Sequence, residues 1–277
     1  MHANFVYALV LSAVAGTATV LGSLVAFAVR RPGARFMAFS LGFSAGVMLL
    51  VSFAELLRTG IESLGFMPAL LAFFAGLGLM FLVDVLVPHV FVAEQGPVED
   101  KGQCFGQETA AGPGRHRWRG GRPAPDPSRL LRTGLLVAVG IGIHNLPEGM
   151  ATFAGALKSR GLGLAIAGAI ALHNIPEGLA VAVPVFCATG SRRKALWWSA
   201  LSGMSELAGA LLAAAVMMPF LSDRLLNVML AGVAGLMVFI SLDELIPGSY
   251  AYGHEHMSVA GIALGMMVMA ASVWLLM

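Results

Sequence analysis

Charged residues are scarce in this chain. They make up 12% of its 277 residues, whereas hydrophobic residues make up 58% and the mean hydropathy is +0.83. Soluble domains are typically about 45–50% apolar and about 25% charged. The composition therefore excludes a set of soluble domains, and the length suits about eight membrane helices of roughly 20 residues each. A net charge of +2 gives no indication of a nucleic-acid partner.

The apolar stretches predict an all-α polytopic membrane protein that forms one transmembrane domain over residues 1–277. The first stretch is too long to be a signal peptide and has no cleavage signature. We expect eight spans, at 4–29, 35–57, 66–92, 131–157, 161–187, 195–218, 225–247 and 257–276.

Lysine and arginine are missing from the interiors of these spans and gather in alternate loops. Four lie in one set of loops: Arg58, Lys158, Arg160 and Arg224. The other thirteen lie in the second set: Arg30, Arg31, Arg35, seven within 93–132, Arg192, Arg193 and Lys194. The positive-inside rule places the richer set in the cytoplasm, which puts both termini on the opposite side of the membrane, outside the cytoplasm. Cys104 and Cys187 then face the cytoplasm, so we expect no disulfide.

Residues 93–130 form the only long hydrophilic stretch of the sequence. The stretch is rich in glycine, proline and arginine and has no apolar period. It predicts a flexible cytoplasmic loop between the third and fourth spans. Its cations would contact anionic lipid or simply fix the topology. Trp118 alone does not make this loop a nucleic-acid site.

A six-residue motif occurs twice, as His144-Asn145-Leu146-Pro147-Glu148-Gly149 and as His173-Asn174-Ile175-Pro176-Glu177-Gly178. Carboxylates buried in hydrocarbon need a partner. Because the spans supply no fixed cation, the partner has to be a metal ion or a proton from outside. The alternative is a set of buried polar residues that bond only to one another, and the repetition of the whole motif argues against it.

The fourth and fifth spans predict an antiparallel hairpin that turns near Arg160. A histidine and a glutamate four residues apart share one face of a helix. The two motifs are centred on the turn, so His144 should lie level with Glu177 and Glu148 level with His173. At 1.5 Å per residue the four side chains are roughly 19–25 Å from the turn, near mid-membrane.

The two motif prolines each free a backbone carbonyl, and such carbonyls are tolerated at this depth where they line a polar cavity. Imidazole with carboxylate suits Zn²⁺ and related divalent ions, and two bridging carboxylates would hold two ions. Glu206, in the sixth span, would close the site, or would be a protonated acid bonded to a neighbouring helix. Met48 would add a thioether, although ordinary packing explains most of the 16 methionines. A second group would line the inner mouth: Asp84, His89, Asp243, Glu244 and His254.

The doubled motif and the eight spans resemble the ZIP family of divalent metal transporters, above all its bacterial branch. The resemblance covers nearly the whole chain and implies a 3+2+3 helix arrangement with inverted repeats. It also implies a central, often binuclear, metal site with bridging motif glutamates. The ligands that it implies are His144, Asn145, Glu148, His173, Asn174, Glu177 and Glu206, and the release path that it implies runs past Asp84, His89, Asp243, Glu244 and His254.

The sequence thus predicts transport of Zn²⁺, or of Fe²⁺, Mn²⁺, Cd²⁺ or Co²⁺, into the cytoplasm by alternating access. The metal is the substrate, and we expect no prosthetic group and no enzymatic activity. An intramembrane metalloenzyme is disfavoured because HExxH is missing. A passive metal channel stays open, and a metal-sensing receptor is disfavoured because no folded cytoplasmic domain is present. The expected partners are metal ions and the lipid bilayer, and the sequence leaves a homodimer open.

Overall fold

The computed structural model describes residues 2–28, 33–86, 127–217, 220 and 222–276, and these ranges contain helices and no strand. The predicted loop 93–130 and His89 lie outside the described residues, except that α5 already begins at Pro127. The helices before and after that gap are α1 (His2–Ala28), α2 (Ala34–Val51), α3 (Arg58–Leu64), α4 (Phe66–Leu86), α5 (Pro127–Lys158), α6 (Arg160–Thr189), α7 (Arg192–Met217), α8 (Asp223–Ile240), α9 (Ile246–Tyr250) and α10 (Glu255–Leu276).

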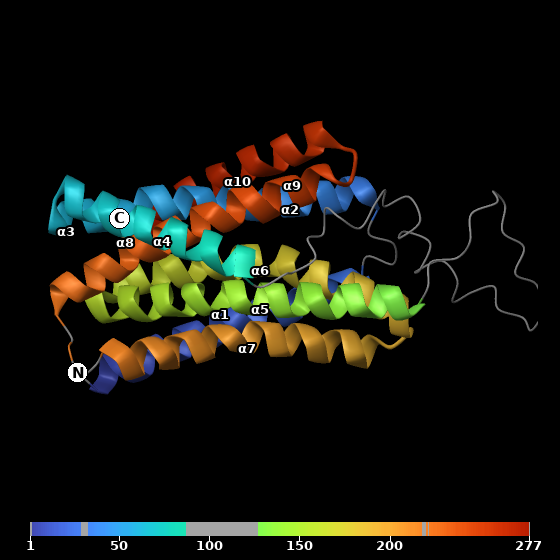
Figure 1. Ribbon diagram of the computed structural model, residues 1–277, viewed down its shortest axis with the longest axis horizontal. Helices are drawn as coiled ribbons and strands as arrows, with labels where there is room; N and C mark the ends of the chain where they lie inside the picture. The colour runs from blue at the N-terminus through green and yellow to red at the C-terminus, as the bar shows by residue number, and fades with distance from the viewer. Residues whose placement is uncertain (1, 29–32, 87–126, 218–219, 221, 277) are drawn as a thin grey trace, which may run out of the picture.

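The helices confirm the predicted polytopic α-helical class. Within the described residues, seven helical stretches are long and apolar enough to cross a membrane: 4–28, 34–64, 66–86, 160–186, 192–216, 223–250 and 255–275. α5 is not among them, although it has 32 residues. Both chain ends lie at the same end of the molecule as α3 (Figure 1).

Two of the long stretches contain a π-helical segment. α2 runs through η1 (Ser52–Leu57) into α3, and α8 runs through η5 (Ser241–Leu245) into α9. Each π-helix begins at a serine whose hydroxyl donates to the carbonyl of a methionine four residues earlier. The distance is 2.7 Å from Ser52 to Met48 and 2.8 Å from Ser241 to Met237. Such π-bulges inside α-helices are often found at functional sites.

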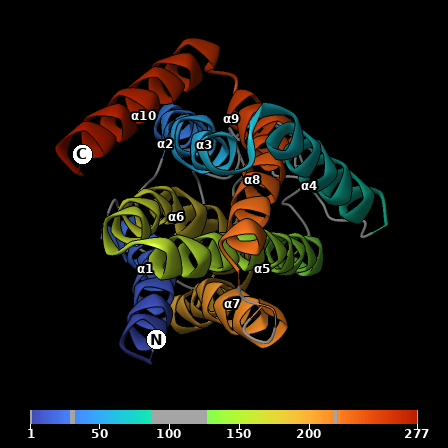
Figure 2. The ribbon, with the colours of Figure 1, turned by 90° about the vertical axis from the view of Figure 1, so that its left-hand side faces the viewer.

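The helices form two bundles, which Figure 2 shows end-on. The hairpin bundle contains α1, α5, α6 and α7, and the flanking bundle contains α2–η1–α3, α4, α8–η5–α9 and α10. Within the hairpin bundle, α1 packs on α6 and α5 on α7; within the flanking bundle, α2 packs on α10 and α4 on α8. Exchanging the first three spans for the last three reproduces these pairings, as the 3+2+3 arrangement requires.

Close helix contacts hold the hairpin in place. A β-carbon on Gly149 would lie 1.8 Å from the carbonyl oxygen of Glu206, and one on Gly178 would lie 1.9 Å from that of Thr19. Only glycine permits these approaches, so each motif glycine brings its helix directly against a neighbour. The contact at Gly149 also positions the helix turn that carries Glu206.

Candidate metal site

The hairpin of α5 and α6 brings the two motifs together as the sequence predicts. Its turn is capped by Ser159, whose side chain accepts a hydrogen bond from the Leu162 amide at 3.1 Å. In the interior, Glu148, His173 and Glu177 each present a ligand atom, and these atoms all lie within 4.8 Å of one another. All three side chains are buried. The pairing expected between Glu148 and His173 is present, with Nε2 3.0 Å from Oε1.

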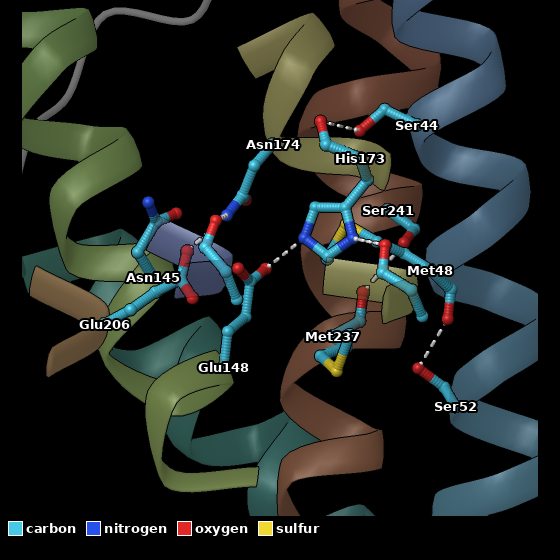
Figure 3. A network of polar contacts seen from close by, with 12 residues as sticks. Ser44, Met48, Ser52, Asn145, Glu148, His173, Asn174, Glu206, Met237 and Ser241 are labelled. Atoms are coloured by element: carbon cyan, nitrogen blue, oxygen red, sulfur yellow. Dashed lines mark hydrogen bonds and ion pairs between the residues drawn. The ribbon is translucent and has the colours of Figure 1, made fainter. Parts of the chain in front are cut away.

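Backbone contacts fix the orientation of His173. Its Nδ1 lies 3.1 Å from the carbonyl oxygen of Ala169, and its own carbonyl accepts from the Ser44 hydroxyl of α2 at 3.3 Å. A proton on Nδ1 satisfies the first contact and leaves the Nε2 lone pair directed at Glu148 (Figure 3). Histidine ligands of metals are commonly oriented by a hydrogen bond of this kind at the other ring nitrogen.

Glu206 adds a third carboxylate to the site from α7. It is fully buried and accepts a short hydrogen bond from the Asn174 amide, which also donates to the Ala15 carbonyl at 3.0 Å. Asn145, with its amide nitrogen facing the acceptors, donates to Glu177 at 3.2 Å and to the Ile141 carbonyl at 2.9 Å. The two motif asparagines therefore hold carboxylates in place.

Several buried acceptor atoms of the site have no hydrogen-bond partner among the residues that the structure describes. They are Oε2 of Glu148, Oε2 of Glu206 and Oδ1 of Asn174, which lie beside the pair that Oε1 of Glu148 forms with Nε2 of His173 at 3.0 Å. A buried polar atom without a partner costs free energy, and a buried carboxylate costs more. Because Glu148 and Glu177 also lie close enough to Glu206 to repel it, the cluster needs added positive charge. Its carboxylates, imidazole and amide oxygen fit a divalent cation.

His144, which the sequence places level with Glu177, has its ion-pair partner outside the hairpin. It lies close enough to influence the charge of Glu177, but its Nε2 forms an ion pair with Glu244 at 2.7 Å. We expect Glu244 at the inner mouth, next to Asp243. In the structure it lies in the π-helix η5 and reaches His144, with its side chain 15% exposed, while Asp243 is exposed. Nothing in the sequence indicated this contact with the first motif.

The remaining predicted residues do not belong to the group of three that the described residues bring within 4.8 Å of one another. Met48 of α2 is fully buried and lies on the α2 side of His173 in Figure 3. Asp84 is half-buried in the last turn of α4. His254 is half-buried and precedes α10, where its carbonyl accepts from the Met257 and Ser258 amides. All three residues belong to the flanking bundle. Their distances from the hairpin therefore depend on the position of the flanking bundle relative to the hairpin bundle.

Comparison with known proteins identifies the class to which this fold and site belong. The family model described as ZIP Zinc transporter matches residues 5–272, and the chain is a member of the ZIP family. It is 47% identical over 277 residues to the zinc transporter ZupT of Chlorobium phaeovibrioides, covering 97% of both chains. It is also 45% identical over 280 residues to the ZupT of Corynebacterium efficiens, covering 98% of both. The family is one of membrane transporters and not of enzymes.

Proposed function

We propose that this protein carries Zn²⁺ or a related divalent ion into the cytoplasm across the bacterial inner membrane, with both termini outside. The ion is the substrate and not a resident cofactor. The observation that carries the proposal is the buried cluster of Glu148, His173 and Glu177, whose ligand atoms lie within 4.8 Å of one another beside acceptor atoms of Glu148, Asn174 and Glu206 that have no hydrogen-bond partner among the described residues. Membership of the ZIP family and relatives named as zinc transporters support it.

The proposed ligands are the residues that both motifs direct inward, together with two from neighbouring helices. Glu148 and Glu177 bridge two ions, because their opposed carboxylates and Glu206 supply more negative charge than one dication neutralises. Two zinc ions should therefore bind per chain in a calorimetric titration, and a single ion would contradict the binuclear site. The full ligand set is His144, Asn145, Glu148, His173, Asn174, Glu177, Glu206 and Met48.

The release path follows the flanking bundle towards the end of the molecule where α9 meets α10. Glu244 forms its first step, since it already contacts His144 of the first motif. When Glu244 holds His144, that histidine is no longer available to the metal ion. The ion is then bound less tightly and leaves the central site more easily. The further residues that we assign to this path are Asp84, His89, Asp243 and His254.

Substitution of Glu177 tests the central site. Glu177→Ala removes a buried carboxylate of the cluster and should abolish uptake of radioactive zinc into proteoliposomes. Glu62→Ala is the matched control, because Glu62 is an exposed carboxylate on α3 that pairs with Arg58 at 2.7 Å. Its uptake should equal that of the wild type. Normal uptake by Glu177→Ala, in protein that still inserts and elutes as a single species, would refute the site.

The carrier and the channel differ in their kinetics. Alternating access limits turnover by a conformational change, so uptake should be slow and should saturate with zinc concentration. A zinc current that rises linearly with voltage across a planar bilayer would favour the channel instead.

A further inference from the structure

The two π-helical stretches are copies of one another in sequence and in structure. Residues 45–56 read AGVMLLVSFAEL and residues 234–245 read AGLMVFISLDEL, which are identical at Ala, Gly, Met, Ser, Glu and Leu. Both contain the serine that bonds to the methionine one turn earlier, and both become π-helical at that serine. Glu55 of η1 therefore occupies the position that Glu244 has in η5.

The hairpin bundle has the matching symmetry. The Asn174 amide donates to the Ala15 carbonyl of α1, and the Gly178 position lies against Thr19 of the same helix. On the other side, Gly149 lies against Glu206 of α7 in the equivalent way. Exchange of α5 with α6 and of α2 with α8 therefore maps His144 onto His173 and Glu244 onto Glu55.

The two histidines nevertheless have different partners in this structure. His144 pairs with Glu244 at 2.7 Å, and it is not part of the group of described ligands that lie within 4.8 Å of one another. His173 is part of that group, and its carbonyl accepts from Ser44, one turn before Met48. Glu55 is half-buried and has Arg58 and Glu62 as its charged neighbours. The structure thus shows one of two symmetry-related arrangements.

We propose that Glu55 is the counterpart of Glu244 in the opposite state of the transport cycle. When the hairpin bundle slides along the flanking bundle, His173 leaves the cluster and pairs with Glu55, while His144 leaves Glu244 and joins the cluster. Glu55 lies further along the same stretch than Ser44, which contacts the His173 carbonyl, so the slide carries His173 along that stretch by several helical turns. Each acid thereby takes one histidine from the metal on its own side of the membrane.

This inference rests on the proposed alternating access, but a cross-linking test does not require zinc uptake. In a background with Cys104→Ser and Cys187→Ser, Glu55→Cys with His173→Cys should form a disulfide under mild oxidation, detected as linked peptides by mass spectrometry. His144→Cys with Glu244→Cys is the positive control for the state seen here. Glu62→Cys with His173→Cys is the negative control, because Glu62 lies further along the same stretch on α3. No 55–173 link, while the 144–244 link forms, would overturn the proposal.

Uptake provides the second measurement with the native histidines in place. Glu55→Gln should lower the maximal zinc uptake rate by about tenfold, whereas Glu55→Asp should restore most of it because the carboxylate is retained. The exposed Glu62→Gln control should transport at the wild-type rate. This control distinguishes loss of the pair between Glu55 and His173 from loss of any negative charge near α3. A wild-type rate for Glu55→Gln would also overturn the proposal. Loss of uptake in Glu177→Ala bears only on the metal site and is independent of both outcomes.

Discussion

At the scale of single residues, the site depends on charge more than on hydrogen bonding. Glu206→Gln keeps the size of the side chain and a contact with Asn174, but it removes one negative charge from a buried cluster. We expect zinc affinity to fall by about tenfold or more, as it does when residues that surround the ligands of a metal site are substituted. Calorimetry on purified protein measures this directly, and an unchanged dissociation constant would show that Glu206 is already neutral and does not bind the ion.

Proton competition acts on the same residues. Carboxylates and imidazole bind a metal only when they are deprotonated, so His173 and the three buried glutamates each exchange protons for metal. Zinc affinity should therefore fall as the pH drops from about 7 to about 5, through the ordinary titration range of histidine. Titrations at several pH values check this, and proton release on binding should appear as a dependence of the binding heat on the buffer. Affinity that does not vary with pH would contradict the ligand set.

At the scale of elements, the hairpin is held by backbone approaches that tolerate no added atom. Gly149→Ala would place a β-carbon 1.8 Å from the Glu206 carbonyl oxygen, so α5 and α7 must move apart. We expect the free energy of unfolding to fall by about 1–3 kcal/mol, which is typical when an extra methyl group is forced into a well-packed core. Thermal unfolding in detergent measures it as a lower midpoint.

The matched control for that substitution lies on the other helix of the hairpin. Gly168→Ala on α6 places a β-carbon where nothing lies within 4 Å, and alanine favours a helix over glycine. Its midpoint should equal or exceed that of the wild type. Equal destabilisation by both substitutions would show that loss of glycine flexibility, and not the close contact, sets the cost.

At the scale of the whole molecule, few polar side chains join the two bundles at the hairpin turn. Lys158 of α5 donates to Ser63 of the α3 stretch at 2.8 Å and makes a short hydrogen bond to Asn227 of α8. Lys158→Met removes both bonds, so hydrogen exchange should speed up in the peptides that contain Ser63 and Asn227. Arg160→Met is the control, because Arg160 stacks on Tyr7 of α1 within the hairpin bundle. Equal effects would mean that Lys158 does not join the bundles.

The helical class and the meeting of Glu148 with His173 and Glu177 could be predicted from the sequence. Membrane helices satisfy their own backbone hydrogen bonds, so hydropathy alone finds them. The i and i+4 spacing of each motif fixes which side chains share a face, and a short turn forces the two copies to meet. The pair of Glu148 and His173 follows from these local rules, because both residues lie on the two helices that the turn joins.

Only the tertiary structure decided which partner each histidine has. Glu244 lies in the π-helix η5 and meets His144 of α5, a contact that the spacing of residues within α8 does not reveal. The offset between the two bundles is likewise a property of packing between surfaces far apart in the chain, and this offset puts His144 beside Glu244 and leaves Glu55 apart from His173. Residue spacing determines which side chains share a face, whereas the position of one bundle against the other determines which of them meet.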